Sequence, residues 1–125
     1  MFAIKGKDYE DAASQVARRF PLNAVAITLR DNPLVWRNTW TAMAYQEGKV
    51  LRTRTYEVEI VDRLGAGDSF AAGLIHGLLD GDLQKGLDYG VAASALKHTM
   101  PGDFAWITRE EVEALLQGSG LRISR

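Results

Sequence analysis

A glycine-rich segment between a strand pattern and a helix pattern constrains the fold more than any other feature of this sequence. Apolar and polar residues alternate from Thr55 to Val61, which predicts a half-buried strand. The segment Gly65–Ser69 (Gly-Ala-Gly-Asp-Ser) follows, and then Phe70, Leu74 and Leu78 recur at helical spacing. A strand, a tight turn and an apolar helix in this order predict an α/β layer in which helices pack on a sheet.

The same segment predicts an anion site. Glycine lets the backbone turn tightly, and the first turn of a helix carries N–H groups without internal partners and a partial positive charge. Together these features bind anions. Asp68 falls in or just before that first turn. Amides beside a carboxylate suit phosphoryl transfer, because the amides can stabilise charge on the phosphoryl oxygens and the carboxylate can accept a hydroxyl proton. The alternative is structural: Asp68 caps the helix, and Gly65 and Gly67 serve a tight turn.

Two other phosphate-binding motifs do not fit these residues. A P-loop needs Lys and then Ser or Thr after its second glycine, and Gly67 is followed by Asp68. The dinucleotide fingerprint needs a glycine at its sixth position, where this chain has Phe70.

The rest of the chain predicts a helix, several short strands and two further helices. Predicted helices span residues 7–20 (capped by Asp8), 83–99 and 109–117, the last with a capping box of Thr108 and Glu111. Predicted strands span residues 24–29 (buried), 34–37, 40–46 and 49–53, with turns at 31–33, 47–48 and 101–103. We expect one α/β domain over residues 1–125, with few strands for the centre of a doubly wound sheet.

Composition excludes several classes of protein. The chain is 46% apolar and 25% charged, which argues against wholesale disorder. A net charge of -1 gives no basic surplus for nucleic acid. There is no cysteine, no apolar run of about 20 residues that could span a membrane, and no apolar signal peptide at the start. We therefore expect a cytoplasmic protein without a nucleic-acid or membrane partner.

Residues 62–70 resemble the C-terminal signature of ribokinase-like (PfkB) carbohydrate kinases, in which an Asp-Thr-x-Gly-Ala-Gly-Asp run precedes an apolar helix. The resemblance continues through residues 71–74 and 92–99. Residues 101–104 and 26–30 are similar to 2-keto-3-deoxygluconate kinases in particular. The resemblance covers nearly all of the chain. It implies the C-terminal portion of a three-layer α/β/α fold.

The resemblance also implies roles for particular residues. Gly65, Ala66 and Gly67 would form the anion hole, and Asp68 would be the base that deprotonates the primary hydroxyl of the sugar. The implied nucleotide-binding residues are Thr28 and Arg30 at the end of a strand, and Ala93 and Ser94 on a helix that lines the adenine pocket. ATP with Mg²⁺ would be the phosphoryl donor, and an acidic keto-sugar such as 2-keto-3-deoxygluconate would be the acceptor.

Two departures from the family pattern matter. Arg63 stands where the signature usually has Thr. Its guanidinium could pair with a phosphate or a sugar carboxylate, or it could be a surface residue. Whole kinases of this family are more than twice as long, so the N-terminal strands, the small β lid, most sugar contacts and the Asn-x-x-Glu segment associated with Mg²⁺ are not in this sequence. The alternative function is therefore an inactive nucleotide-binding or interaction module that forms a homo-oligomer through its incomplete sheet, unless a separate chain supplies the N-terminal half.

The remaining polar and aromatic residues carry structural expectations. Lys97 is expected to be a solvated helix lysine, His76 to be packed or solvated, and His98 to sit at the negative end of a helix dipole. The tryptophans (Trp36, Trp40 and Trp106) are expected in the core or on the sheet, and Arg52 and Arg54 are expected to face water. No His or carboxylate cluster has transition-metal spacing.

Overall fold

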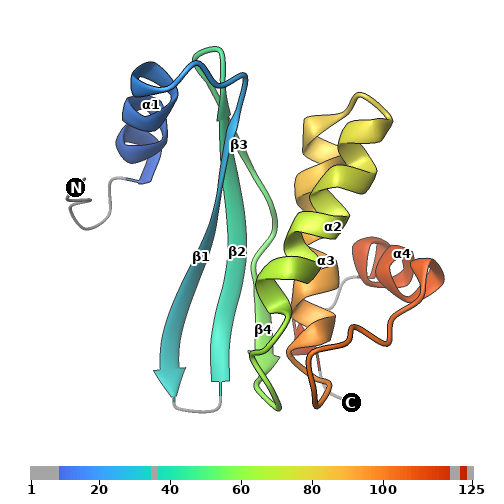
Figure 1. The fold of residues 1–125 in the computed structure, drawn as a ribbon. Coiled ribbons are helices and arrows are strands. Elements are labelled where there is room, and N and C mark those ends of the chain that lie inside the picture. Colours follow the sequence, from blue (N-terminus) through green and yellow to red (C-terminus); the bar gives the residue numbers. More distant parts are fainter. Residues whose placement is uncertain (1–8, 35–36, 119–121, 124–125) are drawn as a thin grey trace.

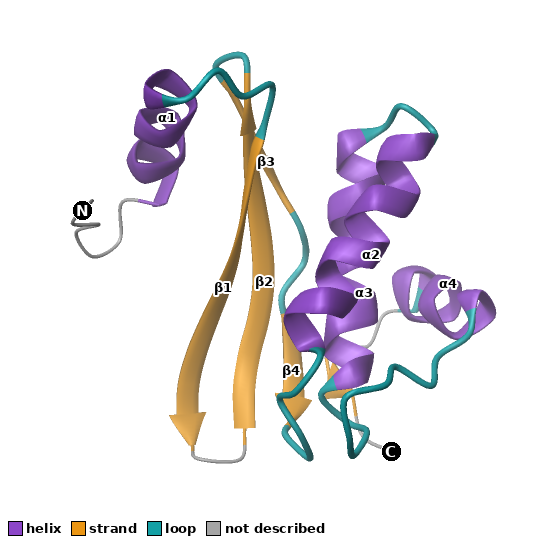
Figure 2. Cartoon of the chain, viewed as in Figure 1, coloured by secondary structure: helices purple, strands orange, loops and turns teal. Residues whose placement is uncertain are grey.

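A computed structural model describes residues 9–34, 37–118 and 122–123. Its strands are β1 (Val25–Leu34), β2 (Arg37–Gln46), β3 (Lys49–Arg52), β4 (Tyr56–Glu59) and β5 (Arg122–Ile123), and its helices are α1 (Tyr9–Arg19), α2 (Ala66–Leu79), α3 (Leu83–Lys97) and α4 (Arg109–Gln117). Figure 1 shows the strands on one side of the α2–α3 pair, with α1 beyond the other side of the sheet and α4 against α3. The expected α/β fold, a sheet with packed helices, is confirmed, and Figure 2 separates its helices from its strands.

The sheet is antiparallel except at its last pair. The strand order is β1-β2-β4-β5, and β3 pairs with β2 beside β4. β4 and β5 pair in parallel. The alternation predicted for β4 is confirmed, because Tyr56 and Val58 are buried while Glu59 is exposed. The predicted hairpin turn at Glu47-Gly48 is also confirmed, since it joins β2 to β3.

Three predictions about β1 were wrong. The expected turn at 31–33 lies inside the strand, which continues to Leu34 with a shift of register between Asp31 and Leu34. Pro33 is tolerated there because β1 is an edge strand of the described sheet and because the irregular register removes the need for a ladder N–H. Residues 34–37 are not a separate strand, since Leu34 ends β1 and Arg37 begins β2. Residues 24–29 are half-buried rather than buried, as an edge strand allows.

The two faces of β2 contact different helices. Trp40, Ala42 and Ala44 belong to the main core cluster, which they share with residues of α3. Met43, at the alternate position, is fully buried but lies outside that cluster, on the face toward α1. The sheet therefore lies between two helical layers. The predicted cap of α1, Asp8, lies outside the described residues.

Helices α2 and α3 pack through glycine. A Cβ added to Gly77 would lie 2.1 Å from the Gly86 nitrogen, and one added to Gly73 would lie 2.6 Å from the Gly90 nitrogen. The prediction that Phe70, Leu74 and Leu78 share one buried face of α2 is therefore only partly correct. Leu78 is 45% exposed because the glycine face of α2 meets α3.

Other expectations had mixed outcomes. The capping box at the start of α4 is confirmed. Arg52 and Arg54 are exposed, as expected; Arg52 pairs with Glu10, and Arg54 donates to the Gly118 carbonyl. Trp40 is buried, but Trp106, in a segment without helix or strand, is 74% exposed, and Trp36 lies outside the described residues. Lys97 was expected in solvent and is fully buried.

Candidate functional site

The site begins at the tight turn before α2. Gly65 is the N-cap of α2 and has a left-handed backbone, with φ 81°. A Cβ at this position would lie 2.4 Å from the carbonyl oxygen of Asp103. Glycine is therefore required twice, by the backbone angle and by the close approach of the turn at 101–103.

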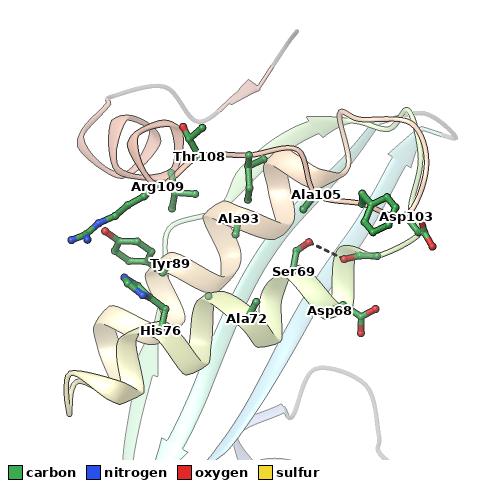
Figure 3. Close-up of a pocket in the computed structure, with 15 residues that line it drawn as sticks. Asp68, Ser69, Ala72, His76, Tyr89, Ala93, Asp103, Ala105, Thr108 and Arg109 are labelled. Carbon is green, nitrogen blue, oxygen red and sulfur yellow. Dashed lines mark hydrogen bonds between the residues drawn. The ribbon is translucent and has the colours of Figure 1, made fainter.

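Backbone amides are available at this turn. The Ala66 amide donates to the Arg63 carbonyl at 3.2 Å, and the amide and hydroxyl of Ser69 both donate to the Gly65 carbonyl at 2.9 Å (Figure 3). Within the described residues, no hydrogen bond uses the amides of Gly65, Gly67 or Asp68. These N–H groups lie at the positive end of a 14-residue helix and are free to meet an anion.

Asp62 holds this turn against the turn at 101–103. Its carboxylate accepts hydrogen bonds from the amide of Leu64 at 3.0 Å and the amide of Gly102 at 2.9 Å. These two backbone hydrogen bonds lower the pKa of Asp62 below its ordinary value. Asp62 therefore acts as a turn-forming residue that fixes the position of Gly65 from both neighbouring segments.

Asp68 is the third residue of α2 and is exposed. Gly65, and not Asp68, is the N-cap, and no side chain caps this helix. Figure 3 shows the Asp68 carboxylate projecting outward from the first turn. A carboxylate in this place can accept a proton from a hydroxyl group that approaches the helix N-terminus.

A cavity of about 470 Å³ extends from this turn. It lies between α2, α3, α4 and the segment at 103–109, which runs alongside the α2–α3 pair in Figure 3. Asp68 lines one end, in the same helical turn as the lining N-cap residue Gly65, and His76, Tyr89 and Arg109 line the other end. The walls between them are formed by small or apolar residues: Ala72, Gly73, Ala93, Phe104, Ala105, Ile107 and Val112. This volume is typical of a small-molecule pocket.

Polar groups gather at the far end of the cavity. The Tyr89 hydroxyl donates to Glu113 Oε1 at 2.5 Å, and Arg109 Nε donates to the same oxygen at 2.8 Å. Burial is the main cause of the raised pKa of Tyr89. The rings of His76 and Tyr89 lie 4.8 Å apart, and His76 Nε2 is buried without a hydrogen-bond partner among the described residues.

The predicted nucleotide residues lie in different places. Ala93 lines the cavity. Ser94 lies behind it, fully buried, where its hydroxyl donates to the Ala66 carbonyl at 2.8 Å and holds α3 against the first turn of α2. Thr28 and Arg30 are on β1 and do not line the cavity; the Arg30 guanidinium lies 5.7 Å from the Trp40 ring centroid.

Arg63 is exposed and comes two residues before Gly65, on the chain that leads into the turn. The structure thus brings Gly65, Asp68 and Ala93 to one cavity. Sequence reasoning missed the wall at 105–109, because an irregular segment gives no periodic signal.

No three His, Cys, Asp or Glu side chains among the described residues gather closely enough to hold a metal ion. None of the helices in the described part of the chain has the length and apolar character needed to cross a bilayer.

Comparison with known proteins identifies relatives of this chain. The profile of the family described as pfkB family carbohydrate kinase matches residues 1–106. The 2-dehydro-3-deoxygalactonokinase of Haloferax volcanii is 34% identical over 119 residues, which cover 94% of this chain and 35% of that protein. The 5-dehydro-2-deoxygluconokinase of Bacillus subtilis is 36% identical over 76 residues, which cover 58% of this chain and 23% of that protein.

Solved structures resemble the fold over almost the whole chain. The crystal structure of 2-dehydro-3-deoxygluconokinase from Thermotoga maritima has a TM-score of 0.85 and 42% identity, over 94% of this chain and 37% of that one. A structure described as a putative 2-keto-3-deoxygluconate kinase from Enterococcus faecalis has a TM-score of 0.79 at 23% identity, over 98% of this chain and 36% of that one, and supports the fold alone. The chain spans about a third or less of the length of these relatives.

Proposed function

Because this chain belongs to the pfkB family of carbohydrate kinases, we propose that it carries the phosphoryl-transfer end of an ATP-dependent kinase for a 2-keto-3-deoxy sugar acid. One observation carries the proposal: unused amides at the start of α2 lie beside the exposed carboxylate of Asp68, at one end of a nucleotide-sized cavity. Carbohydrate kinases of this family use ATP, and these are the groups that transfer of its γ-phosphoryl group requires.

The cavity supports an extended nucleotide. Asp68 and His76 are eight positions apart on α2, which corresponds to about 12 Å along the helix axis. With the γ-phosphate at Gly65, this length leaves room for the other phosphates and the ribose. The base would then lie among small and apolar side chains such as Ala93 and Val112, which contact a flat ring without competing for hydrogen bonds.

The transfer step uses Asp68 as the base. Its carboxylate takes the proton of the primary hydroxyl while the hydroxyl oxygen forms a bond to the γ-phosphorus. The bond from that phosphorus to the bridging oxygen breaks, and ADP leaves with the electron pair. The amides of Gly65 and Gly67 donate to the phosphoryl oxygens throughout. The amide of Ala66 already donates to Arg63, so in this proposal Ala66 shapes the turn and does not contact the phosphoryl group directly.

The names of two relatives and the position of Arg63 support a 2-keto-3-deoxy sugar acid as the phosphoryl acceptor. The relatives at 34% and 42% identity are named for 2-dehydro-3-deoxy sugar acids. The guanidinium of Arg63, exposed at the entrance to the turn, has the fork geometry that binds a carboxylate or a phosphate. Mg²⁺ would accompany the nucleotide.

The test is turnover of ATP by the purified chain, with and without 2-keto-3-deoxygluconate and Mg²⁺, beside nucleotide binding by calorimetry. Asp68→Asn should lower sugar-dependent turnover by about 10²- to 10⁴-fold and leave nucleotide affinity unchanged, because only the proton acceptor is removed. Asp80→Asn, at the opposite end of the same helix, is the matched control and should retain turnover. Unchanged turnover in Asp68→Asn would refute the assignment of the base.

Because the chain spans about a third of its relatives' length, a complete sugar site needs further segments, from a longer chain, a second chain or another copy. If the chain binds nucleotide but shows no turnover, the result favours the alternative, a nucleotide-binding module without catalysis. Adding the N-terminal region of a relative in trans then tests whether the missing segments restore turnover.

A further inference from the structure

Lys97, the last residue of α3, is the one buried lysine or arginine among the residues whose burial the structure describes. Its side chain is 0% exposed. Its Nζ donates to the carbonyl of Met100 at 3.0 Å. An ammonium group has three N–H donors, and no carboxylate of the described residues forms an ion pair with Lys97. Burying a charge with so few partners is costly, so the site must favour the charge in some other way.

The surroundings of Lys97 are the two turns that form the phosphate-binding end of the cavity. Its Cε lies 3.4 Å from the position that a Cβ on Gly65 would take. Met100, which accepts its hydrogen bond, begins the turn that contacts Gly65 through Asp103. Asp62 joins the same two turns from the other side and is attracted by the charge of Lys97. The ammonium therefore lies directly behind the turn whose unused amides face the proposed phosphoryl site.

Packing alone does not account for this residue. A methionine has nearly the same shape as the lysine stem, and it would fill the space without the cost of a buried charge. What methionine cannot supply is a positive charge behind Gly65 or a donor to Met100. Both would help to hold the turn closed while negative charge develops in front of it.

We propose that Lys97 is a positioning residue, a tethered cation that holds the phosphate-binding turn at Gly65 in place and adds positive charge behind its amides. This inference rests on the proposed function, because it assigns Lys97 to the same anion site. It adds a residue remote in sequence from the glycine-rich turn and hidden from the ligand.

The experiment measures binding of inorganic phosphate to the whole chain, followed by the NMR shifts of the Gly65 and Gly67 amides. Lys97→Met should weaken binding roughly tenfold, as expected for loss of one nearby charge in a partly screened site. Lys85→Met is the matched control. Lys85 lies near the other end of α3 and forms an ion pair with Asp80. Its replacement should leave phosphate binding unchanged.

Chemical rescue separates charge from packing. Lys97→Ala removes a propylammonium group, so added propylammonium should restore phosphate binding, whereas propanol, which is neutral and of similar length, should not. If Lys97→Ala folds but is too unstable for the binding measurement, the same comparison is made on its thermal unfolding midpoint, measured from low temperature, which propylammonium should raise more than propanol does.

Two results would overturn the inference alone: equal phosphate affinity in Lys97→Met and the unchanged chain, or equal rescue by propanol and propylammonium. Failure of the unchanged chain to bind phosphate at these amides would overturn the proposed anion site, and the role of Lys97 with it. The two failures are distinguishable because only the second involves the unchanged chain.

Discussion

Gly65→Ala should destabilise the chain more than any ordinary glycine substitution at a left-handed position. A non-glycine residue pays about 1–2 kcal/mol to adopt a left-handed backbone. The added Cβ would also lie 2.4 Å from the Asp103 carbonyl oxygen. Cβ atoms in proteins essentially never come closer than about 3.0 Å to such an atom. The two turns would have to move apart by about 0.6 Å, although the Asp62 carboxylate ties one to the other.

The expected loss of stability is the sum of the backbone cost and the cost of the Cβ contact. Forcing a methyl group into a packed contact costs about 1–3 kcal/mol, so the total loss is roughly 2–5 kcal/mol. Gly81→Ala is the matched control. Gly81 follows the other end of α2 with φ 75°, and a Cβ there meets nothing within 4 Å. It should lose only the backbone part, about 1–2 kcal/mol.

The assay is urea unfolding of the unchanged chain and the two variants, with far-UV circular dichroism as the signal. The difference between Gly65→Ala and Gly81→Ala isolates the contact between the turns, because the backbone angles are nearly equal. Equal free energies of unfolding for the two variants would refute the argument that the turn at 101–103 is held against Gly65.

Two other predictions concern stability. Gly77→Ala should lower the free energy of unfolding in urea by about 3 kcal/mol or more, because its Cβ would lie 2.1 Å from the backbone nitrogen of Gly86. Gly67→Ala is the control in the same helix and should not destabilise the chain, because a Cβ there meets nothing within 4 Å. A similar loss of stability in both variants would contradict the packing of α2 on α3 through glycine. His98 is almost fully buried, and burial lowers its pKa below 6.5, so the folded state binds its proton less readily than the unfolded state. Its contribution to stability is complete above about pH 6.5 and is lost as pH falls through the lowered pKa. The urea midpoint should therefore drop between pH 7.5 and pH 5, and His98→Gln should show a smaller drop; an identical drop would exclude His98 as the cause.

Short-range signals in the sequence predicted the part of the site that lies on one continuous segment. The alternation before the glycine-rich turn placed β4, and the glycines placed the start of α2 and hence Asp68. The capping box placed α4 to the residue. In each case, neighbouring residues determine the local structure, and no distant contact overrides it.

Features that depend on distant contacts were missed. The turn predicted at 31–33 failed because an edge strand with irregular register accepts a proline. The burial of Lys97 could not be read from the sequence, because it follows from the meeting of two turns that lie on either side of α2 and α3. The placement of Thr28 and Arg30 away from the cavity likewise depends on how β1 pairs with β2.

The glycine contact between α2 and α3 also limits how the site can move. Where backbones touch, a shift of one helix along the other would bring a side chain such as Leu74 into a space that only a hydrogen atom fills. The two helices must therefore move together as a rigid body, and the Asp68 carboxylate moves with them. Any adjustment to ligands of different size then falls to the exposed segment at 104–106, beyond the tethered turn, which carries neither helix nor strand and forms part of the opposite wall. The chain thus combines a fixed side, which holds the reacting groups, with an adaptable side, which can follow the shape of what is bound.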